Sequence, residues 1–157
     1  MNHEDHMRLA IESARTAPSA PFGAVIVRRA TGDCLAVGAN RSAENPIFHG
    51  EIDAIIRCAA AHRPVDWTDL ALYTTAEPCP MCQSAIVWAG ISEVYFGTSI
   101  RYLQHRGWHQ IDIRAEEVAQ RTPFRSISIV GGILESECIA LFAAAAAMDN
   151  RGLSVGD

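Results

Sequence analysis

The chain has 157 residues, of which 49% are hydrophobic and 20% charged, and this composition excludes a disordered chain and fits one globular domain. The net charge is −5, and the 13 basic residues are all arginines, scattered along the chain. Because phosphate contacts supply most of the non-specific affinity for nucleic acids, the lack of a basic stripe disfavours a nucleic-acid partner. We expect a single domain over 1–157 with a frayed tail from about 150 to 157.

The apolar runs are shorter than the ~20 residues of a membrane-spanning helix, and the polar N-terminal segment does not resemble a secretory signal. Five cysteines, an odd number, argue against an extracellular disulfide framework. We therefore expect a cytoplasmic protein with no membrane partner. Cys34, Cys58 and Cys138 lie in apolar stretches and are expected to be small buried residues.

In chain order, apolar residues first recur at helical spacing over 3–14 and predict an amphipathic helix. Two β-rich runs, 22–27 and 34–37, flank the turn residues 31–33 and predict a hairpin whose strands are both mostly buried. A loop over 40–48 comes next. The remaining elements continue the alternation of strands and helices: helix 50–61, strand 70–75, helix 81–89, strand 93–96, strand 126–130 and helix 133–148.

The polar and aromatic segment 98–123 is expected to cover a site and to contain a short helix around 114–120. Strands that alternate with helices predict an α/β fold, in which a central sheet is covered on both faces. Sites in such folds gather at strand ends and helix starts. The motifs of this chain fall at those positions.

Two thiols, those of Cys79 and Cys82, lie three residues apart at the expected start of a helix, so both sulfurs can face one metal ion. The positive end of the helix dipole favours their thiolate forms. His49 is the remaining plausible ligand, and a set of three protein ligands leaves a coordination position for water. The spacing therefore predicts one catalytic Zn²⁺ per chain.

Glu51 follows His49 by two residues, near enough to reach that water without binding the metal. We predict that Glu51 takes a proton from the water and delivers it to the substrate. Alternative interpretations are a redox pair formed by Cys79 and Cys82, or a His49 that caps a helix while Glu51 complements its dipole. A zinc-stabilised binding domain without catalysis is the non-enzymatic alternative.

Together, the motif His49-Gly50-Glu51 and the segment TAEPCPMC at 75–82 resemble the cytidine deaminase superfamily, and the similarity spans nearly the whole chain. The resemblance implies a single zinc-dependent deaminase domain with a three-layer α/β/α fold and a central five-stranded mixed sheet. It also implies a homodimer or larger homo-oligomer. The implied reaction is the hydrolytic loss of ammonia from an aromatic amine.

Several segments, 21–27, 72–74, 77–82, 85–86 and 88–89, look most like bacterial guanine deaminases. The motif His49-Gly50-Glu51, with glycine at its centre, instead resembles fungal cytosine deaminase. The segment 127–141 is similar to bacterial tRNA adenosine deaminases. The acidic, lysine-free composition disfavours tRNA. We therefore expect a free nucleobase as substrate, with guanine first and cytosine or another aminopyrimidine or aminotriazine next. Deamination of adenosine in tRNA is the alternative that follows these.

Asn40 matches the asparagine with which family members hold the substrate. Its amide can hold the edge of a heterocycle because it both donates and accepts hydrogen bonds. A loop asparagine that bonds its own backbone is the alternative. Aromatic side chains would supply flat walls for a base, unless they only pack in the core. Asp112 resembles a late aspartate of guanine deaminases and could read the base or transfer a proton. The further expected substrate contacts are Phe22, Gly50, Trp88, Trp108 and Asp112.

Overall fold

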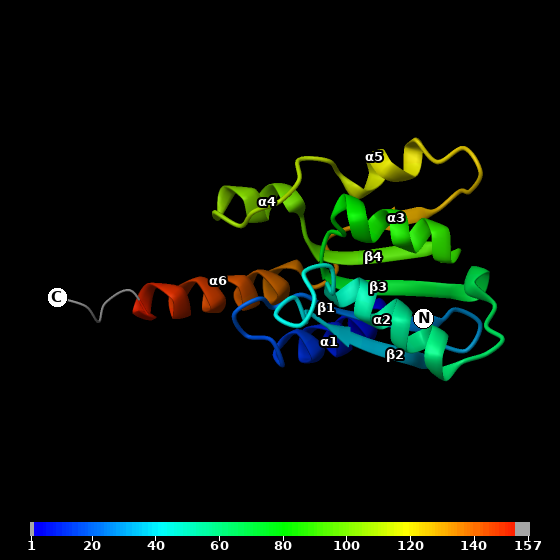
Figure 1. Ribbon diagram of the computed structural model, residues 1–157, viewed down its shortest axis with the longest axis horizontal. Coiled ribbons are helices and arrows are strands. Elements are labelled where there is room, and N and C mark those ends of the chain that lie inside the picture. The colour runs from blue at the N-terminus through cyan, green and yellow to red at the C-terminus, as the bar shows by residue number, and fades with distance from the viewer. Residues whose placement is uncertain (1, 153–157) are drawn as a thin grey trace.

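The computed structural model describes residues 2–152 and has a five-stranded mixed sheet at its centre (Figure 1). The strand order is β2-β1-β3-β4-β5; β1 is antiparallel to both β2 and β3, whereas β3, β4 and β5 are parallel. The five strands are β1 (Gly23–Arg28), β2 (Cys34–Ala39), β3 (Leu70–Ala76), β4 (Glu93–Thr98) and β5 (Ser128–Val130). The mixed sheet expected from the resemblance is confirmed.

Helices cover both faces of this sheet. On one face, α2 (Gly50–Ala61) and α3 (Pro80–Ala89) bury an apolar cluster that includes Ile26, Leu72 and Val94. The opposite face is covered by α1 (His3–Ala14) and α6 (Glu135–Gly152), whose cluster includes Val25 and Tyr73. The three-layer α/β/α prediction is therefore confirmed.

The hairpin strands differ in burial. Strand β1 lies inside the sheet and is almost entirely buried, whereas β2 forms the edge and alternates between buried and exposed residues. Cys34 begins this edge strand and is exposed, so the predictions that both strands are mostly buried and that Cys34 is buried are wrong. An apolar run does not reveal which strand will form the edge. Cys58 and Cys138 are buried as expected.

Helices α1 and α2 begin and end at the expected residues, but the covering segment contains one helix more than expected. Besides α5 (Ala115–Gln120) it forms α4 (Ile100–His105), which starts where the Ser99 hydroxyl accepts a hydrogen bond from the Tyr102 N–H at 3.1 Å. A helix of this length is too short to show a 3.6-residue period. A 3₁₀ turn, η1 (Trp67–Asp69), precedes β3.

At its C-terminal end, α6 continues into the start of the expected frayed tail, and residues 153–157 lie outside the described chain. Among the described helices, none combines the length and apolarity required to cross a membrane.

Glycine at position 38 lets α2 lie directly against strand β2. A Cβ on Gly38 would stand 2.3 Å from the backbone nitrogen of Ala54 and 2.4 Å from the carbonyl oxygen of Gly50. Both atoms are backbone and cannot move aside without shifting the helix. This close approach sets the depth at which the first turn of α2 lies on the sheet.

Gly38→Ala should therefore destabilise the protein by about 1–3 kcal/mol, because the added methyl group forces α2 away from β2. Chemical denaturation measures the free energy of unfolding. Val37→Ala is the matched control in the same strand, since Val37 is 46% exposed, and should cost below about 1 kcal/mol. Equal losses for the two variants would contradict the steric explanation.

Candidate active site

Two helices begin at the same place beside the end of strand β3. His49 is the N-cap residue of α2, and Cys79 is the N-cap residue of α3, with Pro80 in the first helical position. Proline is tolerated there because the first N–H groups of a helix have no intrahelical partner. The two helix starts therefore bring together residues that lie 30 positions apart in the sequence.

The three sequence-predicted ligands form one compact group. The Nδ1 atom of His49 lies 3.6 Å from Sγ of Cys79 and 3.6 Å from Sγ of Cys82. A tetrahedral zinc ion with bonds of ~2.3 Å to sulfur and ~2.0–2.1 Å to nitrogen requires N···S separations of about 3.6 Å. The ligand atoms all lie within 4.8 Å of one another, and residues 2–152 contain no second group of this kind. The donor set fits zinc.

Hydrogen bonds among these three groups favour a thiolate at Cys79. The Cys82 thiol donates to Cys79, and this contact, together with the bond from His49, lowers the pKa of Cys79 to about 4. The same contacts raise the pKa of Cys82 and of His49 above their ordinary values, because each is stabilised as a proton donor to the thiolate. A thiolate is the form in which cysteine binds a metal ion.

Glu51 lies in the first turn of α2, in the pocket that His49 and Cys79 line, and its residue is only 4% exposed. The Thr74 hydroxyl donates a long hydrogen bond, 3.3 Å, to its Oε1 atom. Burial raises the pKa of Glu51 above its ordinary value, and the nearby Cys79 thiolate raises it further. A carboxyl group with a raised pKa is suited to carry a proton near neutral pH.

A cavity of about 360 Å³ opens beside these groups. Of the expected substrate contacts, Asn40, Phe22 and Trp108 line it. The Phe22 and Trp108 rings meet edge to face with their centroids 5.7 Å apart, so they form an apolar corner of the cavity. Its full lining is Phe22, Asn40, Pro46, His49, Glu51, Glu77, Cys79, Met81, Trp108, His109, Gln110 and Ile111.

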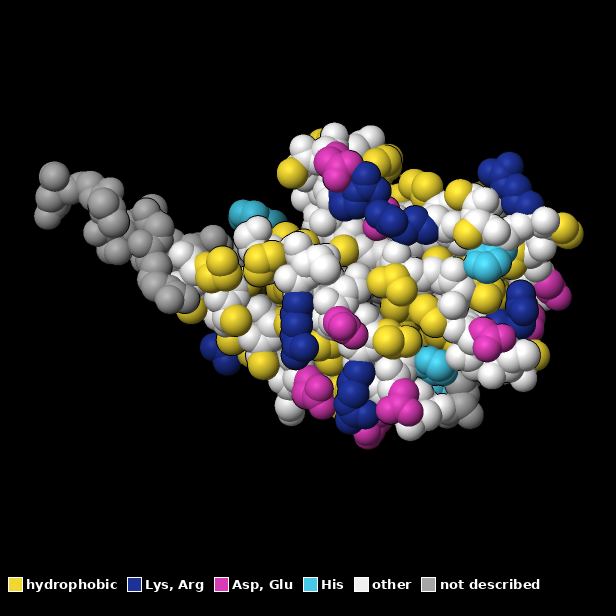
Figure 2. All heavy atoms as spheres, turned by 90° about the horizontal axis from the view of Figure 1, so that it is seen from below, with side chains coloured by type: hydrophobic (Ala, Val, Ile, Leu, Met, Phe, Trp, Pro, Cys, Tyr) yellow, Lys and Arg dark blue, Asp and Glu magenta, His cyan; other side chains and the backbone are white. Residues whose placement is uncertain are grey.

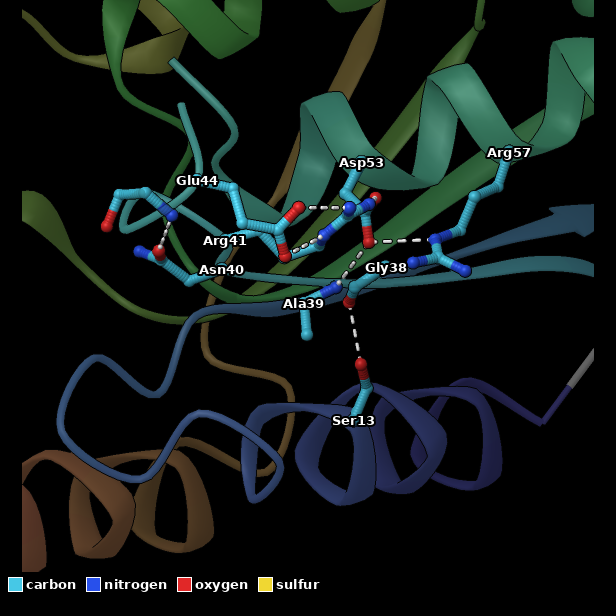
Figure 3. Close-up of polar contacts among 9 residues, drawn as sticks. Ser13, Gly38, Ala39, Asn40, Arg41, Glu44, Asp53 and Arg57 are labelled. Atoms are coloured by element: carbon cyan, nitrogen blue, oxygen red, sulfur yellow. Dashed lines mark hydrogen bonds and ion pairs between the residues drawn. The ribbon is translucent and has the colours of Figure 1, made fainter. Parts of the chain in front are cut away.

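The two polar atoms of the Asn40 side chain have different surroundings. Its Oδ1 atom accepts a hydrogen bond of 2.8 Å from the backbone N–H of Ser42, which closes a local turn (Figure 3). Within residues 2–152, its Nδ2 group has no hydrogen-bond partner, and Asn40 lines the cavity. The amide therefore bonds its own loop and still retains a donor for a ligand.

Trp88 lies outside the cavity, contrary to expectation. Its residue is 76% exposed, and its ring packs against Phe124 with the centroids 5.0 Å apart. Cys79 caps the start of α3, and the helix runs away from it, so Trp88 lies roughly 13 Å further along the axis than Cys79 at ~1.5 Å per residue. Because α3 is apolar on most sides, its sequence did not show which aromatic side chain faces the site.

Asp112 and Gly50 also fall outside the cavity lining. The side chain of Asp112 is 78% exposed, forms an ion pair with Arg114 at 3.7 Å and accepts a hydrogen bond from Gln104 at 3.3 Å. Gly50 serves packing instead, because a Cβ there would stand 2.6 Å from the carbonyl oxygen of Phe22. Neither residue belongs to the set that the cavity brings together.

Glu77 is a cavity residue that the sequence reasoning missed. Its carboxylate is buried and accepts the N–H of Ile100 at 2.9 Å and the N–H of Ala115 at 3.0 Å. These are the first residues of α4 and α5, so one carboxylate holds both helices of the covering segment beside Cys79. The available signal was its place in the motif TAEPCPMC, directly before Pro78 and Cys79.

Comparisons with known proteins agree with this geometry. The family model for the cytidine and deoxycytidylate deaminase zinc-binding region matches residues 1–98. Guanine deaminase from Bacillus subtilis (strain 168) is 33% identical over 141 residues, which cover 82% of this chain and 88% of the relative. A tRNA-specific adenosine deaminase from Buchnera aphidicola subsp. Baizongia pistaciae is 36% identical over 120 residues, covering 75% and 70%.

Solved structures of the protein NE0047 share the fold. A mutant of NE0047 in complex with 8-azaguanine matches with a TM-score of 0.82 and 25% identity, over 94% of this chain and 86% of that chain. The complex of NE0047 with 2,6-diaminopurine matches with a TM-score of 0.82 and 26% identity, over 92% and 82%.

A three-layer fold with a His-Cys-Cys ligand group beside a buried glutamate defines a zinc-dependent hydrolytic deaminase, which acts on C–N bonds. This chain belongs to the cytidine and deoxycytidylate deaminase family, as the family model and its relatives show. Its reaction is the deamination of a nucleobase.

Cys82→Ala should abolish zinc binding and lower the melting temperature, because metal-binding energy is partly folding energy. Elemental analysis of the purified variant measures the metal content directly. The matched control is Cys58→Ala, which also removes a buried thiol but should keep about one zinc ion per chain. Full zinc occupancy in Cys82→Ala would refute the ligand assignment.

Proposed function

We propose that this enzyme deaminates a free nucleobase and that guanine is its preferred substrate. The observation that carries the proposal is the cavity, which brings two of the ligands, His49 and Cys79, together with Glu51 and Asn40 beside the aromatic corner of Phe22 and Trp108. Flat apolar walls and a few converging polar groups are what a purine or pyrimidine ring requires. The guanine deaminase relative and the purine complexes of NE0047 support a purine.

The surface charges favour a free base over RNA. Arg41 directly follows the cavity residue Asn40, but its guanidinium is paired with Glu44 and with Asp53. On the face drawn in Figure 2, arginine side chains are interspersed with acidic ones and form no stripe. Phosphate binding depends on cations that are free to replace counterions. The tRNA relative still makes RNA a substrate to be tested.

The reaction joins the oxygen of water to the ring carbon that bears the amine, and the C–N bond breaks to release ammonia. Bound zinc supplies Lewis acidity that makes water more acidic. Glu51 takes a proton from the attacking water and delivers it to the departing nitrogen. Asn40 donates a hydrogen bond from Nδ2 to an acceptor on the ring. Phe22 and Trp108 exclude bulk water from one side of the base.

Homo-oligomeric assembly, as a dimer or larger, and a cytoplasmic location remain predictions that accompany this proposal.

Ammonia release measured over a panel of candidate compounds tests which substrate the enzyme prefers. Guanine should give the highest kcat/KM; cytosine, other aminopyrimidines, aminotriazines, nucleosides and a tRNA anticodon stem-loop should give lower values. A missing or mismatched polar contact in a base pocket lowers kcat/KM by roughly 10²-fold or more. Activity confined to the RNA would refute the free-base proposal, and a preference for cytosine would refute guanine.

Glu51→Gln should reduce kcat by about 10²–10⁴-fold and still bind zinc, because the amide keeps the size of the side chain but cannot carry the proton. Steady-state kinetics and elemental analysis on the same preparation measure both quantities. Glu116→Gln, an equivalent change at an exposed glutamate, is the control and should leave kcat unchanged. A Glu51→Gln enzyme with full activity would show that another group carries the proton.

A further inference from the structure

A second carboxylate of helix α2, that of Asp53, is buried just behind the site. Asp53 follows Glu51 by two residues, and its side chain is 4% exposed, but it does not line the cavity beside the zinc ligands. Figure 3 shows the carboxylate directed toward the end of strand β2. A buried carboxylate requires partners, because an unpaired charge inside a protein is strongly destabilising.

Its partners lie on both sides of Asn40 in the chain. The Oδ2 atom accepts the backbone N–H of Ala39 at 3.2 Å, and Oδ1 accepts Nη1 of Arg41 at 2.9 Å. A third contact, from Nε of Arg57 to Oδ2 at 2.9 Å, comes from the same helix one turn later. Two of the three contacts therefore hold the residues that flank Asn40, and the third does not reach this loop.

Two backbone hydrogen bonds also hold Asn40 and Arg41 in place. The N–H of Asn40 donates to the carbonyl oxygen of Phe22 at 2.9 Å, and the N–H of Arg41 donates to that of Phe48 at 2.8 Å. Asp53 itself is anchored to the site, since its N–H donates to the carbonyl oxygen of His49 at 2.9 Å. One carboxylate thus connects the helical turn that carries His49 and Glu51 with the loop that carries Asn40.

We propose that Asp53 is a positioning residue for the substrate: it fixes the Asn40 amide at a set distance from Glu51 and the zinc ligands. This inference rests on the proposed function, in which Asn40 holds the base. Asp53 contacts neither substrate nor metal and acts through Ala39 and Arg41. An error of ~1 Å in the placement of a binding group can cost about 10²-fold in rate, so this distance controls kcat/KM.

Asp53→Asn tests the proposal, because the amide keeps the shape of the carboxylate and loses its charge and one of its acceptors. We expect kcat/KM for the preferred base to fall about 10–100-fold, mainly through a higher KM, since Asn40 binds the base before and during the reaction. Zinc content should remain at the wild-type level. A kcat/KM within twofold of wild type would overturn the proposal.

A matched pair of arginine variants keeps the test decisive if Asp53→Asn does not fold. Arg41→Met and Arg57→Met each remove one arginine from the same carboxylate, but only Arg41 belongs to the Asn40 loop. Arg41→Met should raise KM, whereas Arg57→Met should leave KM unchanged. Equal effects of the two variants on KM would show that Asp53 contributes stability alone and would overturn the proposal.

A double-mutant cycle separates positioning from stability. In an Asn40→Ala background, Asp53→Asn, or Arg41→Met in its place, should change kcat/KM by less than about twofold, while its effect on the free energy of unfolding persists. Independent, additive losses in kcat/KM would overturn the positioning role and leave the proposed function intact. If Asn40→Ala alone retained full activity, the substrate contact in the proposed function would fail, and the role of Asp53 with it.

Discussion

The convergence of two helix N-termini on three ligand atoms is the constraint on which the rest of the structure depends. His49 and Cys82 lie 33 positions apart in the sequence, yet Nδ1 and Sγ approach to 3.6 Å. This short distance between the two atoms requires that α2 and α3 lie on the same face of the sheet and start at the same edge. Gly38 and Gly50 permit this, because a Cβ at either position would collide with backbone atoms of its neighbours.

Three buried carboxylates surround this centre, and their partners differentiate their roles. Glu77 accepts two helix N–H groups, and Asp53 accepts two arginines and one N–H, so both charges are stabilised by permanent donors. Glu51 instead accepts a long hydrogen bond from the Thr74 hydroxyl, interacts with the Cys82 thiol of the ligand group, and faces the cavity. A buried carboxyl group that faces the cavity and is held neither by an arginine nor by an N–H group of another helix is the one suited to exchange protons with a ligand.

Much of the fold was predictable where local periodicity is strong. Helices α1 and α2 have clear apolar faces, and their predicted bounds agree with the structure. Prediction failed where the local pattern carries little information: α4 is six residues long, and the apolar run of β2 does not show that this strand forms an edge. In the same way, α3 is apolar on several sides, so its pattern did not show that Trp88 faces solvent.

By itself, the sequence determined the chemistry: the spacing of Cys79 and Cys82, with His49 and Glu51 on a second helix start, specifies the ligands and the candidate proton carrier. These residues are readable because short motifs at helix starts impose their own local geometry. Only the tertiary structure decided what surrounds that centre. Glu77 and Asp53 act on residues 23 to 38 and 12 to 14 positions away, and contacts at such separations leave no periodic signal in the chain.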